Sequence, residues 1–247
     1  MEATFDTLLA FVLASFLTGF FKTSFGGGIG MVIAPILTLL VSARMAMGII
    51  APLMVLGDLL VVYFFWKKWD AKFVLALLPS MVVGTIVGTA LLAYLSDAGI
   101  RRMIGGFAFF YSLYHIIKLI RQSEITYVPP TRTAGHLVGM LAGFSTTAAH
   151  SGGVITTPYF ISSGLKKGAV VATGFGLFGI TNVFKLGTYL YADITDPQII
   201  LWAAYTVPLL AVGAYLGYQA HKAVSNRVFN SVILIIALTG SLKLLLI

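Results

Sequence analysis

The chain has 247 residues, of which 59% are hydrophobic and 10% charged, with a formal net charge of +8, a mean hydropathy of +0.98 and no cysteine. A soluble domain of this size lacks the polar groups to cover so much apolar surface, so the composition excludes a soluble enzyme, a disordered chain and a disulfide-linked secreted domain. The apolar runs lack the strict alternation of barrel strands, which leaves an all-α polytopic membrane protein.

Five apolar segments occupy the first half of the chain. They are expected at 4–21, 31–41, 46–66, 73–95 and 103–120. A Gly-rich break over 22–30 separates the first two, and the second is too short to span a bilayer. The most polar stretch, 121–133, contains two adjacent prolines and is predicted to link a first repeat, 1–120, to a second, 134–247.

The second half repeats this plan. Its segments are expected at 134–144, 154–162, 169–191, 199–220 and 228–247, with a break over 145–153. Two sets of residues recur with matching spacing: Gly30 and Pro35 with Gly153 and Pro158, and Pro79, Gly84 and Gly88 with Pro208, Gly213 and Gly217. The pattern predicts two repeats of about five helical segments, as in many secondary transporters. Chance is the alternative, because Gly and Pro are frequent in membrane helices.

The loop charges test how the two repeats are oriented. If the first two segments return the chain to its starting side, ten Lys and Arg residues fall on one side of the membrane and four on the other. If those segments form one broken crossing, the division is seven and seven. The positive-inside rule therefore favours inverted repeats with both termini outside the cytoplasm, and the basic charge indicates topology rather than nucleic-acid binding. Two full crossings and a re-entrant V remain open for the first two segments.

The two breaks form the predicted substrate site. Irregular backbone at membrane depth is tolerated only where it is buried in protein or lines a wet cavity, and the helix N-termini that follow favour an anion. The predicted binding residues at the breaks are Lys22, Ser24, Gly26, Gly27, Gly28 and Gly30, and Thr146, Thr147, His150, Ser151, Gly152 and Gly153. Pro35 and Pro158 are expected to kink the short segments. The alternative is that the glycines serve helix packing.

Four ionisable residues fall at membrane depth, where charge usually marks a function. Lys22 and Lys185 are predicted to hold an anion, with snorkelling to an interface as the alternative for each lysine, and Asn182, close to Lys185, is also a predicted binding residue. Asp58 is expected to pair with a lysine or to carry a coupling proton, and a structural pair with Lys185 is one reading. His150 is expected either to carry a proton or to be a satisfied structural histidine.

Enzyme signatures are missing from the sequence. The histidines and acids show no metal-ligand spacing, so no metal or cofactor is predicted. A Ser24–His150 dyad for a membrane-embedded hydrolase is the least favoured hypothesis, because nothing in the spacing singles it out.

The two breaks resemble the paired signature of the TauE/SafE family, the sulfite exporter and sulfonate permease group. The matching residues are Ser24-Phe25-Gly26-Gly27-Gly28-Ile29-Gly30 with Pro35, and Ser151-Gly152-Gly153 with Pro158. The resemblance extends over essentially the whole chain, and the second copy departs from it at His150 and Ser151, where more glycine is expected. It implies a multi-pass transporter of the bacterial inner membrane for sulfite, sulfoacetate or related organosulfonates.

These observations together predict a secondary transporter, most simply an exporter. The expected mechanism is alternating access around an anion site near the membrane midplane, with Lys22 and Lys185 supplying positive charge. An anion channel is the first alternative. The expected partners are a small anion and the lipid bilayer, with a homodimer as an open option and no nucleic acid.

Overall fold

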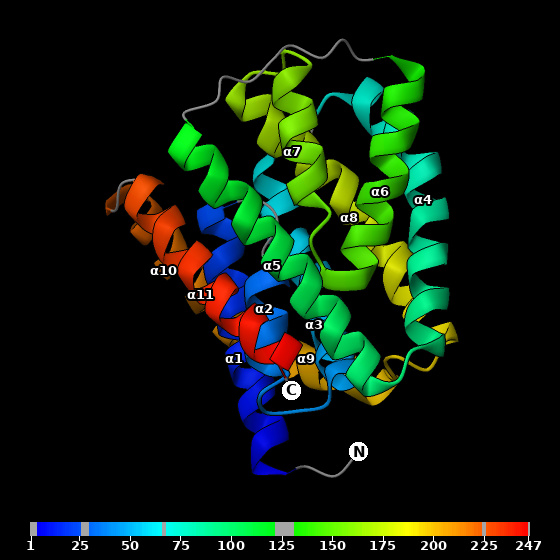
Figure 1. The fold of residues 1–247 in the computed structure, drawn as a ribbon, viewed down its shortest axis with the longest axis vertical. Helices are drawn as coiled ribbons and strands as arrows, with labels where there is room; N and C mark the ends of the chain where they lie inside the picture. Colours follow the sequence, from blue (N-terminus) through cyan, green and yellow to red (C-terminus); the bar gives the residue numbers. More distant parts are fainter. Residues whose placement is uncertain (1–3, 26–29, 66–67, 122–130, 224–225, 247) are drawn as a thin grey trace.

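The structure is a computed structural model that describes residues 4–25, 30–65, 68–121, 131–223 and 226–246. Every regular element within these ranges is an α-helix, which confirms the all-α class (Figure 1). Four of the helices are long and apolar enough to cross a membrane, and a bent pair of helices gives a fifth candidate span. The chain is therefore a multi-pass helical protein.

The first half of the chain follows the predicted order of segments. Its helices are α1 (Phe5–Phe25), α2 (Gly30–Leu37), α3 (Ala43–Phe65), α4 (Ala71–Tyr94) and α5 (Asp97–Arg121). One boundary was wrong: α1 continues through Lys22 and Ser24, which were expected in the break. The helix continues because the Ser24 hydroxyl donates to the carbonyl of Phe20 one turn earlier, at 2.6 Å, instead of competing with the helix. Gly26, Gly27 and Gly28 lie outside the described residues.

The second half also keeps the predicted order. Its helices are α6 (Arg132–Ala149), α7 (Gly153–Ser162), α8 (Lys167–Tyr191), α9 (Pro197–Tyr205), α10 (Val207–Ala223) and α11 (Asn226–Leu246). The expected break over 145–153 was too long, because Thr146 and Thr147 are helical. The Thr147 hydroxyl donates to Gly143 O at 2.9 Å, and α6 ends only at His150, where φ is 50°.

The segment predicted as one helix over 199–220 consists of α9 and α10, which meet at an angle of 55°. The bend lies at Thr206, whose hydroxyl donates to Ala203 O at 2.8 Å. Pro208 follows two residues later and has no N–H to bond the carbonyl of residue 204. In the first half, α4 stays one helix although Pro79 stands at the matching place, and the residue two before that proline is Leu77, which has no hydroxyl.

Each half of the chain packs its first helix against the other half. The first helix of each half packs against the fourth segment of the other, so α1 lies on α10 and α6 lies on α4. Glycine permits the close approach: a Cβ at Gly213 would meet Phe16 O, and one at Gly84 would meet Met140 O. Small residues commonly serve such contacts in membranes. These glycines of the P-x4-G-x3-G pattern therefore act in helix packing.

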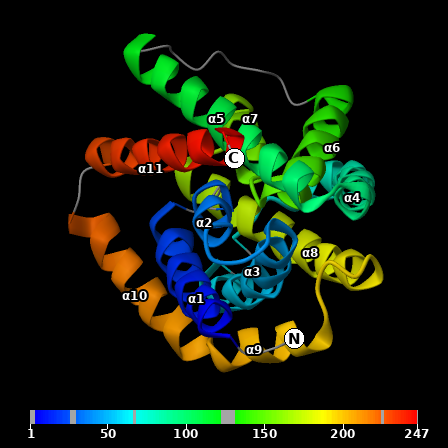
Figure 2. The ribbon, with the colours of Figure 1, turned by 60° about the horizontal axis from the view of Figure 1, so that its bottom comes forward.

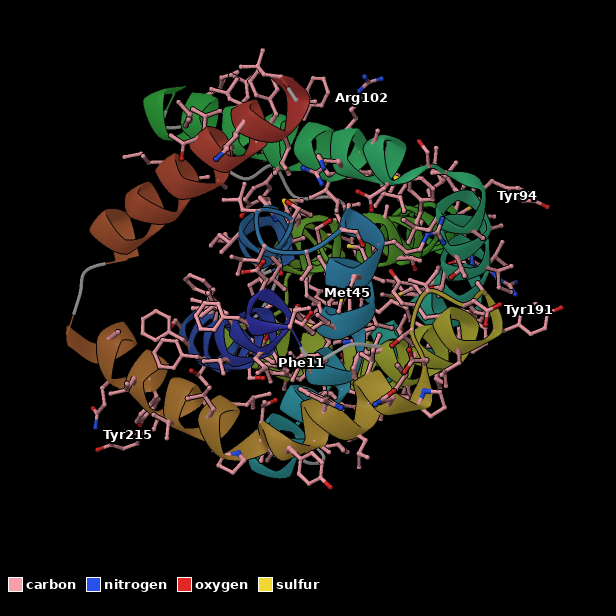
Figure 3. All side chains as sticks on the ribbon, turned by 90° about the horizontal axis from the view of Figure 1, so that it is seen from below. Phe11, Met45, Tyr94, Arg102, Tyr191 and Tyr215 are labelled. Carbon is pink, nitrogen blue, oxygen red and sulfur yellow. The ribbon has the colours of Figure 1, made fainter. Side chains whose placement is uncertain are left out.

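The interior lies around α2 and α3, with α4, α5, α10 and α11 around them (Figure 2). The side chains of Ile49, Ile50 and Leu53 on α3 are fully buried. Tyr94 and Tyr191, at the ends of α4 and α8, are among the most exposed side chains and point outward (Figure 3). Many large apolar side chains are exposed on the outer helices, as a hydrocarbon environment requires.

Candidate functional site

The two breaks meet in the interior. Gly30, the first residue of α2, lies against the end of α6, where a Cβ on Gly30 would meet the Cβ of His150 and the carbonyl oxygen of Ala149. In Figure 1, α1 and α2 occupy the lower part of the molecule and α6 and α7 the upper part. Two segments that are more than a hundred residues apart in the chain thus form one place, as a shared substrate site requires.

Lys22 is neutralised within the protein. Its Nζ lies 2.7 Å from Asp58 Oδ1 and donates to Met54 O at 2.9 Å. The second carboxylate oxygen of Asp58 accepts from Asn182 Nδ2 at 2.6 Å. The series of contacts Lys22–Asp58–Asn182 thus joins α1, α3 and α8 through the carboxylate of Asp58. Asp58 pairs with a lysine, as one of the expectations had it, and the partner is Lys22 rather than Lys185, which was the alternative.

Lys185 has no such partner. Its Nζ donates to His150 Nδ1 at 2.9 Å and to Thr146 O at 3.4 Å, and no carboxylate of the described residues lies within ion-pair distance. Lys185 is 0% exposed and Lys22 is 5% exposed. Both side chains end inside the protein, which contradicts the snorkelling alternative. An ammonium has three hydrogens, so Lys185 retains hydrogen-bonding capacity for a ligand.

His150 connects Lys185 to α3. Its Nε2 lies 3.3 Å from Met47 O. Because an ammonium only donates, His150 Nδ1 accepts from Lys185, and the ring proton on Nε2 donates to Met47 O. His150 is thus a neutral, satisfied histidine in this arrangement. Its left-handed backbone, with φ at 50°, ends α6 and directs the ring toward α3 and α8.

The buried cluster carries an excess of positive charge. Lys22, Asp58 and Lys185 lie close enough to influence one another electrostatically. Two lysines and one aspartate give a net charge of +1 when both lysines are protonated and His150 is neutral. The carbonyl end of α6, which Lys185 contacts, supplies only a partial negative charge. An uncompensated buried charge is costly, so the cluster favours an anionic ligand.

Several hydroxyls that the sequence assigned to the site are occupied within the protein. Ser24 donates to Phe20 O and also contacts Gly217 O at 2.9 Å. Ser151 contacts Ser145 Oγ at 2.6 Å and Ser145 O at 3.1 Å. A hydroxyl has a single hydrogen, and in these serines it is already donated within the protein. These groups therefore hold the ends of the helices together. Gly152 is also tightly packed, with Ala142 O at 2.7 Å from an ideal Cβ.

Three buried side-chain atoms lack any hydrogen-bond partner and stand out from the rest of the described residues. They are Thr18 Oγ1, Thr156 Oγ1 and Asn182 Oδ1; a fourth unpaired atom, Asp58 Oδ1, is compensated by its ion pair with Lys22. Thr156 lies in the first half of α7, beyond Gly153, and Asn182 lies one turn before Lys185. Buried polar atoms are nearly always paired, so an unpaired one needs an explanation such as a ligand.

Other groups that contact the candidate site were missed from the sequence. Tyr189 is fully buried, and its hydroxyl donates to Thr147 O at 2.6 Å. Its position four residues after Lys185 places both on one face of α8, a signal that the spacing offered. The carbonyls of Met47 and Met54 had no signal, because backbone acceptors depend on the fold alone. Pro35 and Pro158 lie inside α2 and α7, which continue past them.

Comparison with protein families gives one match. A family model described as sulfite exporter TauE/SafE matches residues 11–244. The matched range contains both breaks and all four charged or titratable residues of the buried cluster. No curated protein and no solved structure matches the chain significantly.

Proposed function

The chain belongs to the sulfite exporter TauE/SafE family, and we propose from this premise that it exports sulfite, sulfoacetate or related sulfur-containing anions across the bacterial inner membrane. The family is one of transporters and not of enzymes, so the hypothesis of a membrane-embedded hydrolase is set aside. The observation that carries the site assignment is the buried ammonium of Lys185, which has no carboxylate partner among the described residues.

Lys185 is the proposed anchor for the anion. It offers a positive charge in an environment from which water is excluded, where an ion pair is much stronger than at a surface. The N-termini of α2 and α7 begin at the two breaks and add positive helix-dipole ends. The net charge of the cluster matches a monoanion, so a bound anion would neutralise it.

Lys22 has a different proposed role. Its charge is already balanced by Asp58, and the same carboxylate holds Asn182. The Lys22–Asp58–Asn182 chain therefore positions α1, α3 and α8 around Lys185. Lys22 contributes to the electrostatic field of the site without contacting the anion.

Alternating access is the proposed mechanism. The two halves meet at the breaks and exchange helices through the α1–α10 and α6–α4 contacts. Rocking at these contacts would expose the anion to each side in turn. A membrane potential that is negative inside favours export of a monoanion by about 2.3 kcal/mol per 100 mV, so export needs no coupling ion.

The proposed orientation places both termini outside the cytoplasm. The division of Lys and Arg residues between the two sides supports it. A tag at either end should react with an impermeant reagent in intact cells. Protection of both tags until the membrane is opened would contradict the orientation, without affecting the transport proposal.

The decisive experiment is sulfite flux into proteoliposomes. We expect saturable flux in the wild type, strong loss in Lys185→Met, and normal flux in Lys243→Met, which removes an exposed lysine of α11. Flux that rises linearly with concentration and carries current would favour the anion channel. Normal flux in Lys185→Met would contradict the site.

A further inference from the structure

The amide of Asn182 is held in one orientation. Its Nδ2 donates to Asp58 Oδ2 at 2.6 Å, and a carboxylate can only accept, so the amide nitrogen must face Asp58. The amide oxygen, Oδ1, then faces away from the carboxylate. This oxygen is buried and has no hydrogen-bond partner among the residues that the structure describes, and the whole residue is 4% exposed.

The residue that carries this oxygen lies about one turn from the proposed anchor on α8. Asn182 and Lys185 are three residues apart on α8, and residues at this spacing lie on one face of a helix. Both belong to the cluster that contains Asp58. The cluster therefore presents one cation and one hydrogen-bond acceptor.

An acceptor in an anion site selects among anions. The oxygens of sulfate or of a simple sulfonate can only accept hydrogen bonds, so such a ligand would leave Asn182 Oδ1 unpaired. An anion that carries a donor beside its charge can satisfy both groups. Sites built to pair a substrate hydroxyl discriminate strongly against analogues that lack it.

Resting on the proposed transport function, we infer that Asn182 Oδ1 makes the site specific for monoanions that carry one hydrogen-bond donor. Hydrogen sulfite and short hydroxysulfonates share this chemistry. Sulfoacetate, a dianion without a donor, does not, so the inference narrows the proposed substrates. Asn182 is thus a specificity-determining residue, distinct from the charge supplied by Lys185.

Two competitors of matched charge and shape test the inference. Isethionate and ethanesulfonate are both monoanions and differ by a single hydroxyl. In wild-type proteoliposomes, isethionate should inhibit sulfite flux at about one-tenth the concentration that ethanesulfonate needs, because a buried acceptor is paired by one ligand and not by the other. Equal inhibition, or none by isethionate, would overturn the inference while sulfite flux still supported the transport function.

A variant assigns the effect to Asn182. In Asn182→Ala the two competitors should become equivalent, with saturable sulfite flux remaining. Thr181→Val is the matched control, because it removes a neighbouring buried hydroxyl that bonds only Leu177 O, and it should keep the tenfold ratio. A ratio that survives in Asn182→Ala would also overturn the inference.

Flux of labelled isethionate distinguishes the two candidate ligands, hydroxysulfonates and hydrogen sulfite, both of which carry a donor. Saturable isethionate flux assigns the preference to hydroxysulfonates. Inhibition without isethionate flux assigns it to hydrogen sulfite. Absence of any saturable sulfite flux in the wild type would instead refute the proposed transport function itself.

Discussion

The two buried lysines differ in the partners of their ammonium groups. Lys22 lies 2.7 Å from a carboxylate and also bonds a backbone carbonyl, whereas the contacts of Lys185 within the described residues are a neutral histidine and a carbonyl. From the sequence, both lysines were predicted as charges at membrane depth that hold an anion. The difference teaches that two lysines of the same predicted kind can differ in whether the protein supplies a carboxylate partner, and only the one without such a partner supports a ligand. Four experiments test this contrast, from the largest expected effect to the smallest.

Removing the partner of Lys22 should have the largest effect on stability. Asp58→Leu leaves an unpaired buried cation and is expected to cost about 3–5 kcal/mol of unfolding free energy. Thermal unfolding of the purified protein in detergent measures it. The double variant Lys22→Met with Asp58→Leu should recover most of the loss, and Asp6→Ala, at an exposed acid of α1, serves as the control. A double variant as unstable as Asp58→Leu would show that the ion pair is not the cause.

Lys185→Met should show the reverse profile. Replacing an unbalanced buried cation with an apolar side chain is expected to leave unfolding almost unchanged. Anion affinity should fall by about 2–5 kcal/mol, measured as the change in kcat/KM for sulfite flux. A variant that unfolds early but transports normally when cooled would assign Lys185 to structure and remove the contrast.

His150→Asn separates the two bonds of the histidine. Asparagine tolerates a left-handed backbone and can offer an oxygen to Lys185, but it cannot reach Met47 O. We expect a stability loss of about 0.5–1.5 kcal/mol, the value of one net hydrogen bond, with sulfite affinity retained. His150→Ala should cost more, because it also removes the acceptor for Lys185. Equal losses in both variants would show that the acceptor contributes nothing.

The last experiment concerns the bend between α9 and α10, where the expected stability loss is no larger than that of His150→Asn and no effect on transport is expected. Thr206→Leu removes a hydroxyl that bonds Ala203 O and Ser15 and makes the position resemble Leu77 of the first half. A loss of about 0.5–1.5 kcal/mol in unfolding free energy is expected. Because neither of these two bonds involves Lys185 or its partners, the KM for sulfite should not change. A changed KM would link the bend to the site.

The sequence predicted the helical order well and the limits of the breaks poorly. Apolar segments and their charged flanks located nearly every helix, since burial in lipid requires long apolar runs. The breaks were overestimated at Lys22–Ser24 and at Thr146–Thr147, because hydroxyls that bond their own helix look the same in a sequence as hydroxyls that end one. The α9–α10 bend was missed for a related reason, as Pro79 and Pro208 share a motif but only one interrupts its helix.

Within the site, the charged residues were predictable and their partners were not. Charge at membrane depth identified Lys22, Asp58, His150 and Lys185. The choice of Lys22 over Lys185 as the partner of Asp58 depends on how α1, α3 and α8 pack, which no local spacing encodes. The division of the sequence into two inverted repeats stays a prediction, supported by the exchanged packing of α1 and α6.

The contact between Gly30 and His150 makes the two breaks mechanically dependent. Gly30, the first residue of α2, lies against His150, and the His150 ring bonds the Lys185 ammonium. A sliding motion of α2 along α6 would therefore act on Lys185 through the His150 ring. If the halves move as proposed, a displacement of α2 would change the position of the His150 ring and with it the bond to Lys185. A Cβ at position 30 would meet the Cβ of His150 and the carbonyl oxygen of Ala149, so any larger residue there would push α2 away from the end of α6.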